Sequence, residues 1–239
     1  MNYGHWPPYV PVAERRRKAK AQMQKLQKKG LDLQPIEIQG RKIATSFWGI
    51  AWNDHLESFG DYANRIPRGR TYVRNGSVCH LDIQKGKIKA CVSGSSIYNV
   101  SISIQPLPSK KWTQVKSKCA GQVGSMLELL QGKLSSGVMS VVTNKASGLF
   151  PAPSEIKLGC DCPDGAYMCK HIAAVLYGVG ARLDNQPEVL FKLRGVDHDE
   201  LISADINLTN NTGNTQGKSR RIADDSLADV FGIDITPAP

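Results

Sequence analysis

Residues 159–171 read GCDCPDGAYMCKH and place three cysteines and one histidine within twelve residues. The pattern is Cys-x-Cys, a gap of six residues, then Cys-x-His, and its four side chains are those of Cys160, Cys162, Cys169 and His171. Three thiolates and one imidazole are typical of structural zinc, which takes four nitrogen and sulfur ligands in a tetrahedron. We therefore expect one structural zinc ion here. A catalytic zinc is disfavoured because protein ligands fill all four positions.

The residues around these ligands predict a strand, a turn and a helix. A strand is expected near 156–158, and Asp161 and Asp164 are interpreted as turn residues that support the ligands. Over 170–182, apolar residues recur at i, i+3, i+4 and i+7, which predicts an amphipathic helix. Disulfide pairing is the alternative, but cytosolic thiols stay reduced and the nearby histidine favours a metal.

Upstream of residue 159 the sequence changes from helical to strand periodicity. Asn-Gly at 75–76 and Lys-Gly at 85–86 stand between alternating segments, which is a strong hairpin signal. The predicted antiparallel meander has four strands, at 70–74, 77–83, 87–93 and 98–104. Helices are predicted at 13–29, 47–59, 112–118, 123–134, 138–144 and 187–193. The expected fold is α+β: an antiparallel β-meander with helices, followed by a small zinc-bound strand-turn-helix module.

The composition divides the chain into four segments. We predict a basic, partly flexible arm at 1–44, a basic sheet-and-helix domain at 45–145, a zinc finger with following helices at 146–202, and a linker with a short apolar segment at 203–239. The apolar segment could dock a partner or fold back on its own domain, and both readings stay open. Its candidate docking residues are Leu227, Val230, Phe231 and Ile233.

Charge is spread unevenly along the chain. The 31 Lys and Arg residues against 21 Asp and Glu give a net charge of +10, yet residues 1–150 alone carry +15 and the remainder −5. Such asymmetry indicates a polyanionic partner for the first part of the chain, with a merely solvated basic surface as the alternative. No apolar run approaches the roughly 18–20 residues of a membrane span, and the N-terminus lacks a signal-peptide pattern, so we expect a soluble cytoplasmic protein without membrane contact.

Basic residues of the arm and of the predicted sheet are candidate phosphate contacts. In the predicted strand 70–74, two arginines and a tyrosine would share one face, which suits a phosphate backbone with an aromatic contact to sugar or base. An ordinary charged outer face is the alternative. The candidates are Arg15, Arg16, Arg17, Lys18, Arg68, Arg70, Tyr72, Arg74, Lys85, Lys87 and Lys89. Cys79 and Cys91, with His80, could form a second metal site or a disulfide, although ordinary half-buried strand cysteines are favoured.

The segment CKHIAAVLY after Cys-x-Cys resembles a SWIM-type zinc finger. The wider chain resembles the bacterial SWIM-finger proteins linked to SWI/SNF-type helicases, through FWGIAW at 47–52, RGR at 68–70, LFP at 149–151, FKLRGVD at 191–197 and the segment 227–235. The resemblance implies zinc binding with a role in DNA or protein interaction, and a helicase-type partner.

The sequence carries no phosphate-binding loop, dinucleotide fingerprint or nucleophile elbow, so we expect no enzyme and no small-molecule substrate. The predicted function is a non-enzymatic, nucleic-acid-associated accessory protein, with DNA as the first candidate and RNA as the second. The alternative is a protein–protein adaptor that makes no direct DNA contact.

Overall fold

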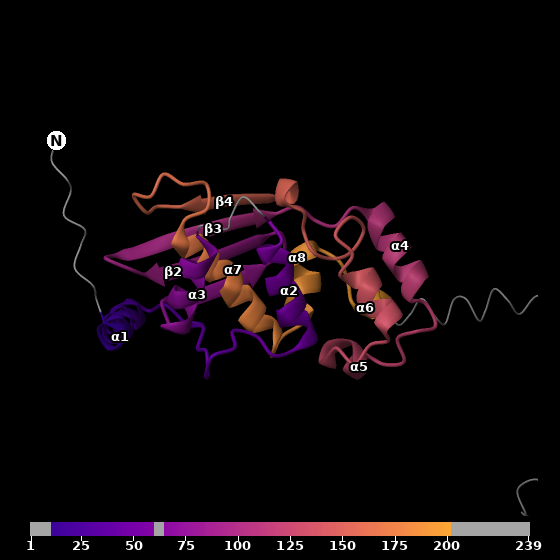
Figure 1. Cartoon of the computed structure of the whole chain (residues 1–239), viewed down its shortest axis with the longest axis horizontal. Coiled ribbons are helices and arrows are strands. Elements are labelled where there is room, and N and C mark those ends of the chain that lie inside the picture. Colours follow the sequence, from indigo (N-terminus) through magenta and orange to yellow (C-terminus); the bar gives the residue numbers. More distant parts are fainter. Residues whose placement is uncertain (1–10, 60–64, 202–239) are drawn as a thin grey trace, which may run out of the picture. The chain divides into compact units, whose positions relative to one another are not determined.

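The computed structural model describes residues 11–59 and 65–201 (Figure 1). Helices and strands follow one another in the order α1 (Val12–Lys28), α2 (Phe47–Glu57), α3 (Ile66–Arg74), β1 (Val78–Gln84), β2 (Lys87–Ser93), β3 (Ile97–Ile104), α4 (Ser109–Cys119), α5 (Met126–Gln131), α6 (Ser136–Val142), β4 (Ile156–Cys160), α7 (Lys170–Leu183) and α8 (Glu188–Arg194). The α+β class predicted from the sequence is confirmed. Among the described residues, no helix combines the length and the apolar character needed to cross a membrane.

The sheet is antiparallel throughout and has the strand order β1-β2-β3-β4. In its centre Ile88 of β2 lies opposite Ile83 of β1 and Ile102 of β3, and all three side chains are buried. Burial alternates along β2 and β3, as expected for a sheet with one face in the core. The β1–β2 hairpin turns at Gly86, whose φ of 66° is costly for residues other than glycine.

The strand predicted at 70–74 is wrong, because these residues belong to helix α3. Ile66, Gly69 and Val73 are the buried residues of that helix, and their spacing is helical. Asn-Gly at 75–76 is the helix terminus and not a hairpin turn: Gly76 has φ of 69°, and the amide of Ser77 donates back to the carbonyl of Tyr72. The alternation of polar and apolar residues over five positions was too short to outweigh burial of the helical stripe.

The fourth strand of the sheet comes from the finger segment. Strand β4 pairs with β3, with Ser101 opposite Gly159 and Ile102 opposite Leu158. The segments 45–145 and 146–202 therefore share one sheet and one hydrophobic core. A buried ion pair strengthens this junction: Arg194 of α8 donates to the carbonyl of Gln105 at 2.6 Å and to the carboxylate of Glu155 at 3.1 Å.

Helix α7 is the central helix and contacts all four strands (Figure 1). Helix α3 packs closely on it, because a Cβ on Gly69 would lie 2.5 Å from the Cβ of Ala173. Helix α2 crosses it as well, and the indole of Trp52 donates to the carbonyl of Leu176 at 2.9 Å. This packing positions the start of α7, where the predicted zinc ligands Cys169 and His171 are found.

Other predicted elements are present with shifted ends. The helix expected over 123–134 is shortened to α5, because the Ser125 hydroxyl caps its first turn and Gly132 ends it with φ of 67°. The basic helix α1 packs weakly, mainly through the buried Ala19, as its thin apolar stripe predicts. The predicted linker and the docking residues Leu227, Val230, Phe231 and Ile233 lie outside the described residues.

Candidate metal centre

The four predicted zinc ligands come together at the junction of β4 and α7. Cys160 ends β4, Cys162 lies in the turn that follows, Cys169 is the residue preceding α7, and His171 lies in the first helical turn. One ligand atom from each side chain lies within 4.8 Å of the others. The strand end and the helix start thus present residues from both halves of the motif to one point.

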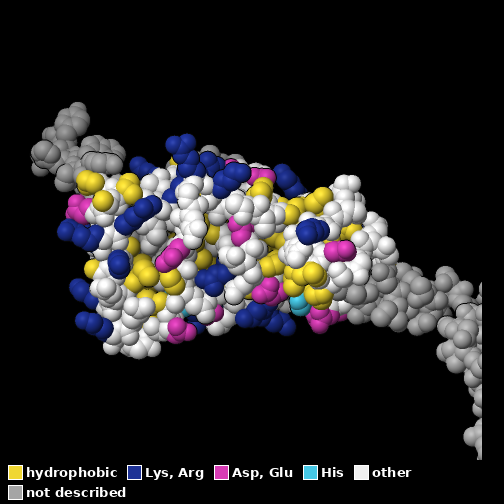
Figure 2. All heavy atoms as spheres, turned by 90° about the horizontal axis from the view of Figure 1, so that it is seen from below, with side chains coloured by type: hydrophobic (Ala, Val, Ile, Leu, Met, Phe, Trp, Pro, Cys, Tyr) yellow, Lys and Arg dark blue, Asp and Glu magenta, His cyan; other side chains and the backbone are white. Residues whose placement is uncertain are grey.

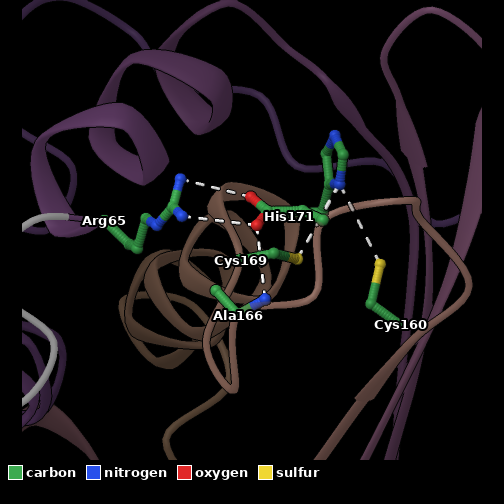
Figure 3. A network of polar contacts seen from close by, with 6 residues as sticks. Arg65, Cys160, Ala166, Cys169 and His171 are labelled. Atoms are coloured by element: carbon green, nitrogen blue, oxygen red, sulfur yellow. Dashed lines mark hydrogen bonds and ion pairs between the residues drawn. The ribbon is translucent and has the colours of Figure 1, made fainter.

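The distances between the ligand atoms suit a tetrahedral ion. Figure 3 shows one ring nitrogen of His171 facing two sulfurs, and Nδ1 lies 3.9 Å from Sγ of Cys160 and 3.8 Å from Sγ of Cys169. A zinc ion about 2.3 Å from sulfur and about 2.0 Å from nitrogen would hold such atoms about 3.6 Å apart. The two nitrogen–sulfur distances therefore lie within a few tenths of an ångström of those in a zinc site.

Protonation at the site favours the ligating form of the histidine. His171 is 2% exposed, and burial, with a smaller contribution from Lys170, lowers its pKa to about 4. Its ring is consequently neutral at pH 7, as a metal ligand must be. Burial also raises the thiol pKa of Cys160 and Cys169, so zinc has to displace protons from sulfur when it binds.

Two aspartates shape the loop that carries the ligands. Asp161 accepts hydrogen bonds from the backbone amide of Asn99 at 2.8 Å and from its side-chain amide at 2.7 Å, which extends the β3–β4 pairing past the last strand residue. Asp164 accepts from the amide of Ala166 and forms an ion pair with Arg65 at 3.2 Å (Figure 3). The Cys-x-Cys end is thereby attached to the sheet, and the following turn is attached to the segment before α3.

Aromatic rings, and not a hydrogen bond, hold the outer side of the imidazole. Tyr98 of β3 stacks on the His171 ring at 4.4 Å between centroids, and Tyr72 of α3 meets its edge at 5.3 Å. Nε2 of His171 is buried without a hydrogen-bond partner among the described residues. Metal-bound histidines usually donate this second N–H to a carboxylate or carbonyl. Tyr98 was not among the residues predicted from the sequence, because only the β3–β4 pairing brings it to the site.

The structure does not place the predicted arginine and tyrosine side chains on one nucleic-acid-binding face. In helix α3, Arg70 donates to the Tyr177 hydroxyl at 2.8 Å and pairs with Glu57 at 2.5 Å. Tyr72 instead contacts the ring of His171, while Arg68 and Arg74 are exposed. The predicted Arg-Tyr-Arg face is therefore wrong, because residues at i and i+2 diverge on a helix.

The remaining basic candidates are distributed over α1 and the sheet. Lys87 and Lys89 are exposed on β2, and Lys85 lies in the hairpin turn before it. Arg16, Arg17 and Lys18 are exposed on α1. The side chain of the neighbouring Arg15 lies outside the described part of the molecule.

Cys79 and Cys91 are free thiols. A β-bulge places His80, and not Cys79, opposite Cys91, and the ring of His80 accepts a hydrogen bond from the Gln34 amide. Burial raises the pKa of Cys79 to about 11, so this thiol stays protonated at neutral pH. Within the described residues, the ligand-type groups that cluster are the Cys160 to His171 set and an exposed Asp197-His198-Asp199 run, neither of which includes these cysteines.

Comparison with known proteins identifies the centre. The SWIM zinc finger family matches residues 142–179, a span that contains all four ligands. The chain therefore contains a SWIM zinc finger, and its Cys160, Cys162, Cys169 and His171 cluster is suited to binding one zinc ion.

A wider similarity extends beyond the finger. The chain is 32% identical over 164 residues to the uncharacterized protein Rv2102 of Mycobacterium tuberculosis, an alignment that covers 67% of this chain and 59% of that protein. The chain thus spans about three fifths of the length of this relative. No solved structure matches.

Proposed function

We propose that this protein is a zinc-stabilised, non-enzymatic accessory protein that binds nucleic acid and recruits a SWI/SNF-type helicase partner. DNA is the first candidate for the nucleic acid, and RNA is the second. The observation that carries nucleic-acid binding is the excess of positive charge in the first 150 residues, whose net charge is +15 while the remaining residues carry −5. A cytoplasmic location belongs to the same proposal, since a thiolate zinc centre suits a reducing compartment.

Exposed cations on α1 support phosphate binding. The side chains of Arg16, Arg17, Lys18 and Lys20 are exposed and form no ion pair with any described residue. On the face shown in Figure 2, Lys and Arg side chains gather over the half that contains α1, and fewer are seen over the half that contains α4, α5 and α6. Cations that form no ion pair can neutralise phosphates without first losing a carboxylate partner.

The zinc centre supports a structural and not a catalytic role. When bound, zinc would supply the cross-link between the end of β4 and the start of α7. Three cysteines and one histidine would occupy all four positions of a tetrahedral ion, which leaves no position for a substrate or an activated water. The zinc centre would then attach β4, which pairs with β3 in the sheet, to helix α7.

Salt dependence of DNA binding tests the proposal. A fluorescently labelled duplex is titrated with the zinc-loaded full chain at salt concentrations from 50 to 200 mM. Affinity should fall steeply, because every neutralised phosphate releases counterions. Absence of binding even at 50 mM would reject the nucleic-acid role and favour the adaptor function.

Purification from cells tests the helicase partner. The tagged chain is isolated with and without nuclease treatment, and co-purifying proteins are identified. A helicase-type protein retained after nuclease treatment supports direct recruitment, whereas a helicase lost on nuclease treatment indicates tethering through nucleic acid alone.

A further inference from the structure

One face of the sheet carries exposed or half-buried side chains over most of its area. Its opposite face buries Ile83, Ile88 and Ile102 against the core. By strand alternation and register, the first face, here called the open face, consists of His80, Asp82, Gln84, Lys87, Lys89, Cys91, Asn99, Ser101, Ser103, Lys157 and Gly159.

Three lysines of the open face lie close together, two on β2 and one on β4, with β3 between them. Lys87 of β2 lies opposite Ser103 of β3, which in turn lies opposite Lys157 of β4, so the two lysines are about 10 Å apart at a strand spacing of about 4.8 Å. Lys89 follows Lys87 at about 7 Å along β2. All three are exposed, and none forms an ion pair with a described residue.

Small polar groups fill the space between these lysines. A shallow hollow of about 460 Å³ over β1 to β4 has Lys89, Asn99, Ser101 and Gly159 among its lining residues. Serine hydroxyls and lysine ammonium groups are ordinary donors to phosphate oxygens. The two carboxylates nearby are already bonded, Asp82 to Gln84 and Asp161 to Asn99, which reduces their competition for the lysines.

The open face continues into the basic helix α1. Ser93 lies on the same side of β2 as Lys87 and Lys89, and its hydroxyl is hydrogen-bonded to Gln22 of α1. Helix α1 therefore borders the open face at the Ser93 end, and its exposed cations extend the positive surface beyond the sheet.

We propose that the open face and α1 together bind the phosphate backbone of duplex nucleic acid without sequence preference. This inference rests on the proposed nucleic-acid function and names its surface. No phenylalanine, tyrosine or tryptophan is among the open-face residues, and the one ring on this face, the imidazole of His80, already accepts a hydrogen bond from the amide of Gln34. Unstacked bases of a single strand therefore find few rings to stack on. A duplex also carries the higher charge density.

The finger contributes directly to this surface. Lys157 belongs to β4, the strand that ends at Cys160, so the zinc centre positions one of the three lysines.

A matched pair of triple variants tests the surface. Lys87→Gln, Lys89→Gln and Lys157→Gln are combined in one variant, and the control combines Lys110→Gln, Lys118→Gln and Lys133→Gln, three exposed lysines of the α4–α5 region with the same change in charge. Binding to two unrelated duplex DNAs, a duplex RNA and a single strand is measured across 50–200 mM salt. Thermal unfolding confirms that both variants fold.

The plot of log affinity against log salt should become shallower by about 2.7 for the open-face variant, since each duplex phosphate contact contributes about 0.9. The control should keep the wild-type slope, and both DNA sequences should bind equally. Equal loss in the two variants, tighter binding to the single strand, or a tenfold preference between duplex sequences would overturn the inference while nucleic-acid binding itself stood. No binding by the wild type would reject the proposed function as well.

Discussion

The stacked ring of Tyr98 gives a direct prediction about zinc affinity. The change is Tyr98→Ala, which removes the ring whose centroid lies 4.4 Å from that of His171. Because Nε2 of His171 has no hydrogen-bond partner among the described residues, the ring contacts are what orient the imidazole. Without this contact, the imidazole must be ordered by zinc binding itself, and the affinity should fall.

The size of the effect follows from the contact that is lost. An aromatic pair contributes about 0.5–1.5 kcal/mol beyond the area that it buries. At about 1.4 kcal/mol for each tenfold change in a binding constant, zinc affinity should fall by about 2- to 12-fold. Tyr98→Phe keeps the ring and loses only the hydroxyl, so its affinity should stay within about twofold of the wild type.

Competition with a zinc chelator of known affinity measures this change in the folded, full-length chain. Urea unfolding of the zinc-loaded and zinc-free forms separates an effect on zinc from a general loss of stability. If Tyr98→Ala binds zinc as tightly as the wild type, or if Tyr98→Phe loses as much as Tyr98→Ala, the ring does not position His171.

Two further predictions concern packing. Gly69→Ala should destabilise the fold by about 1–3 kcal/mol in urea unfolding, because its Cβ would lie 2.5 Å from a side chain of α7. The control Gly165→Ala should be neutral, since no heavy atom lies within 4 Å of its Cβ. Equal stabilities of the two variants would contradict the close approach of α3 and α7. Arg194→Ala should lower the free energy of unfolding by about 3–5 kcal/mol, because it removes the ion-pair partner of the mostly buried Glu155 carboxylate. Lys116→Ala removes a more exposed ion pair and should lower it by only about 0–1 kcal/mol. A cost below about 1 kcal/mol for Arg194→Ala would mean that this pair adds little to the junction.

Elements with local signals could be predicted from the sequence. The Lys-Gly turn at 85–86 and the alternation on either side of it specify the β1–β2 hairpin, because both the turn and the pairing are local. The apolar spacing after His171 specifies α7 in the same way. The four zinc ligands could be predicted for a related reason, since all of them lie within one short segment.

Long-range features could not be predicted in this way. The alternation at 70–74 predicted a strand, but these residues form a helix whose Gly69 packs on α7. This contact can be recognised only once the helices are placed. The pairing of β4 with β3 joins residues more than fifty positions apart, and it is this pairing that brings Tyr98 to His171 and Lys157 to the face that carries Lys87. Neither relation leaves a periodic pattern in the sequence.

The zinc content of a single-cysteine variant tests the central claim most directly. Purified wild-type chain and Cys162→Ala are analysed for metal by mass spectrometry, with Cys91→Ala, a half-exposed cysteine outside the cluster, as the matched control. We predict about one zinc ion per chain in the wild type and the control, and a large loss in Cys162→Ala, because a structural site needs all four ligands. Full zinc content in Cys162→Ala would contradict the four-residue centre described for this finger.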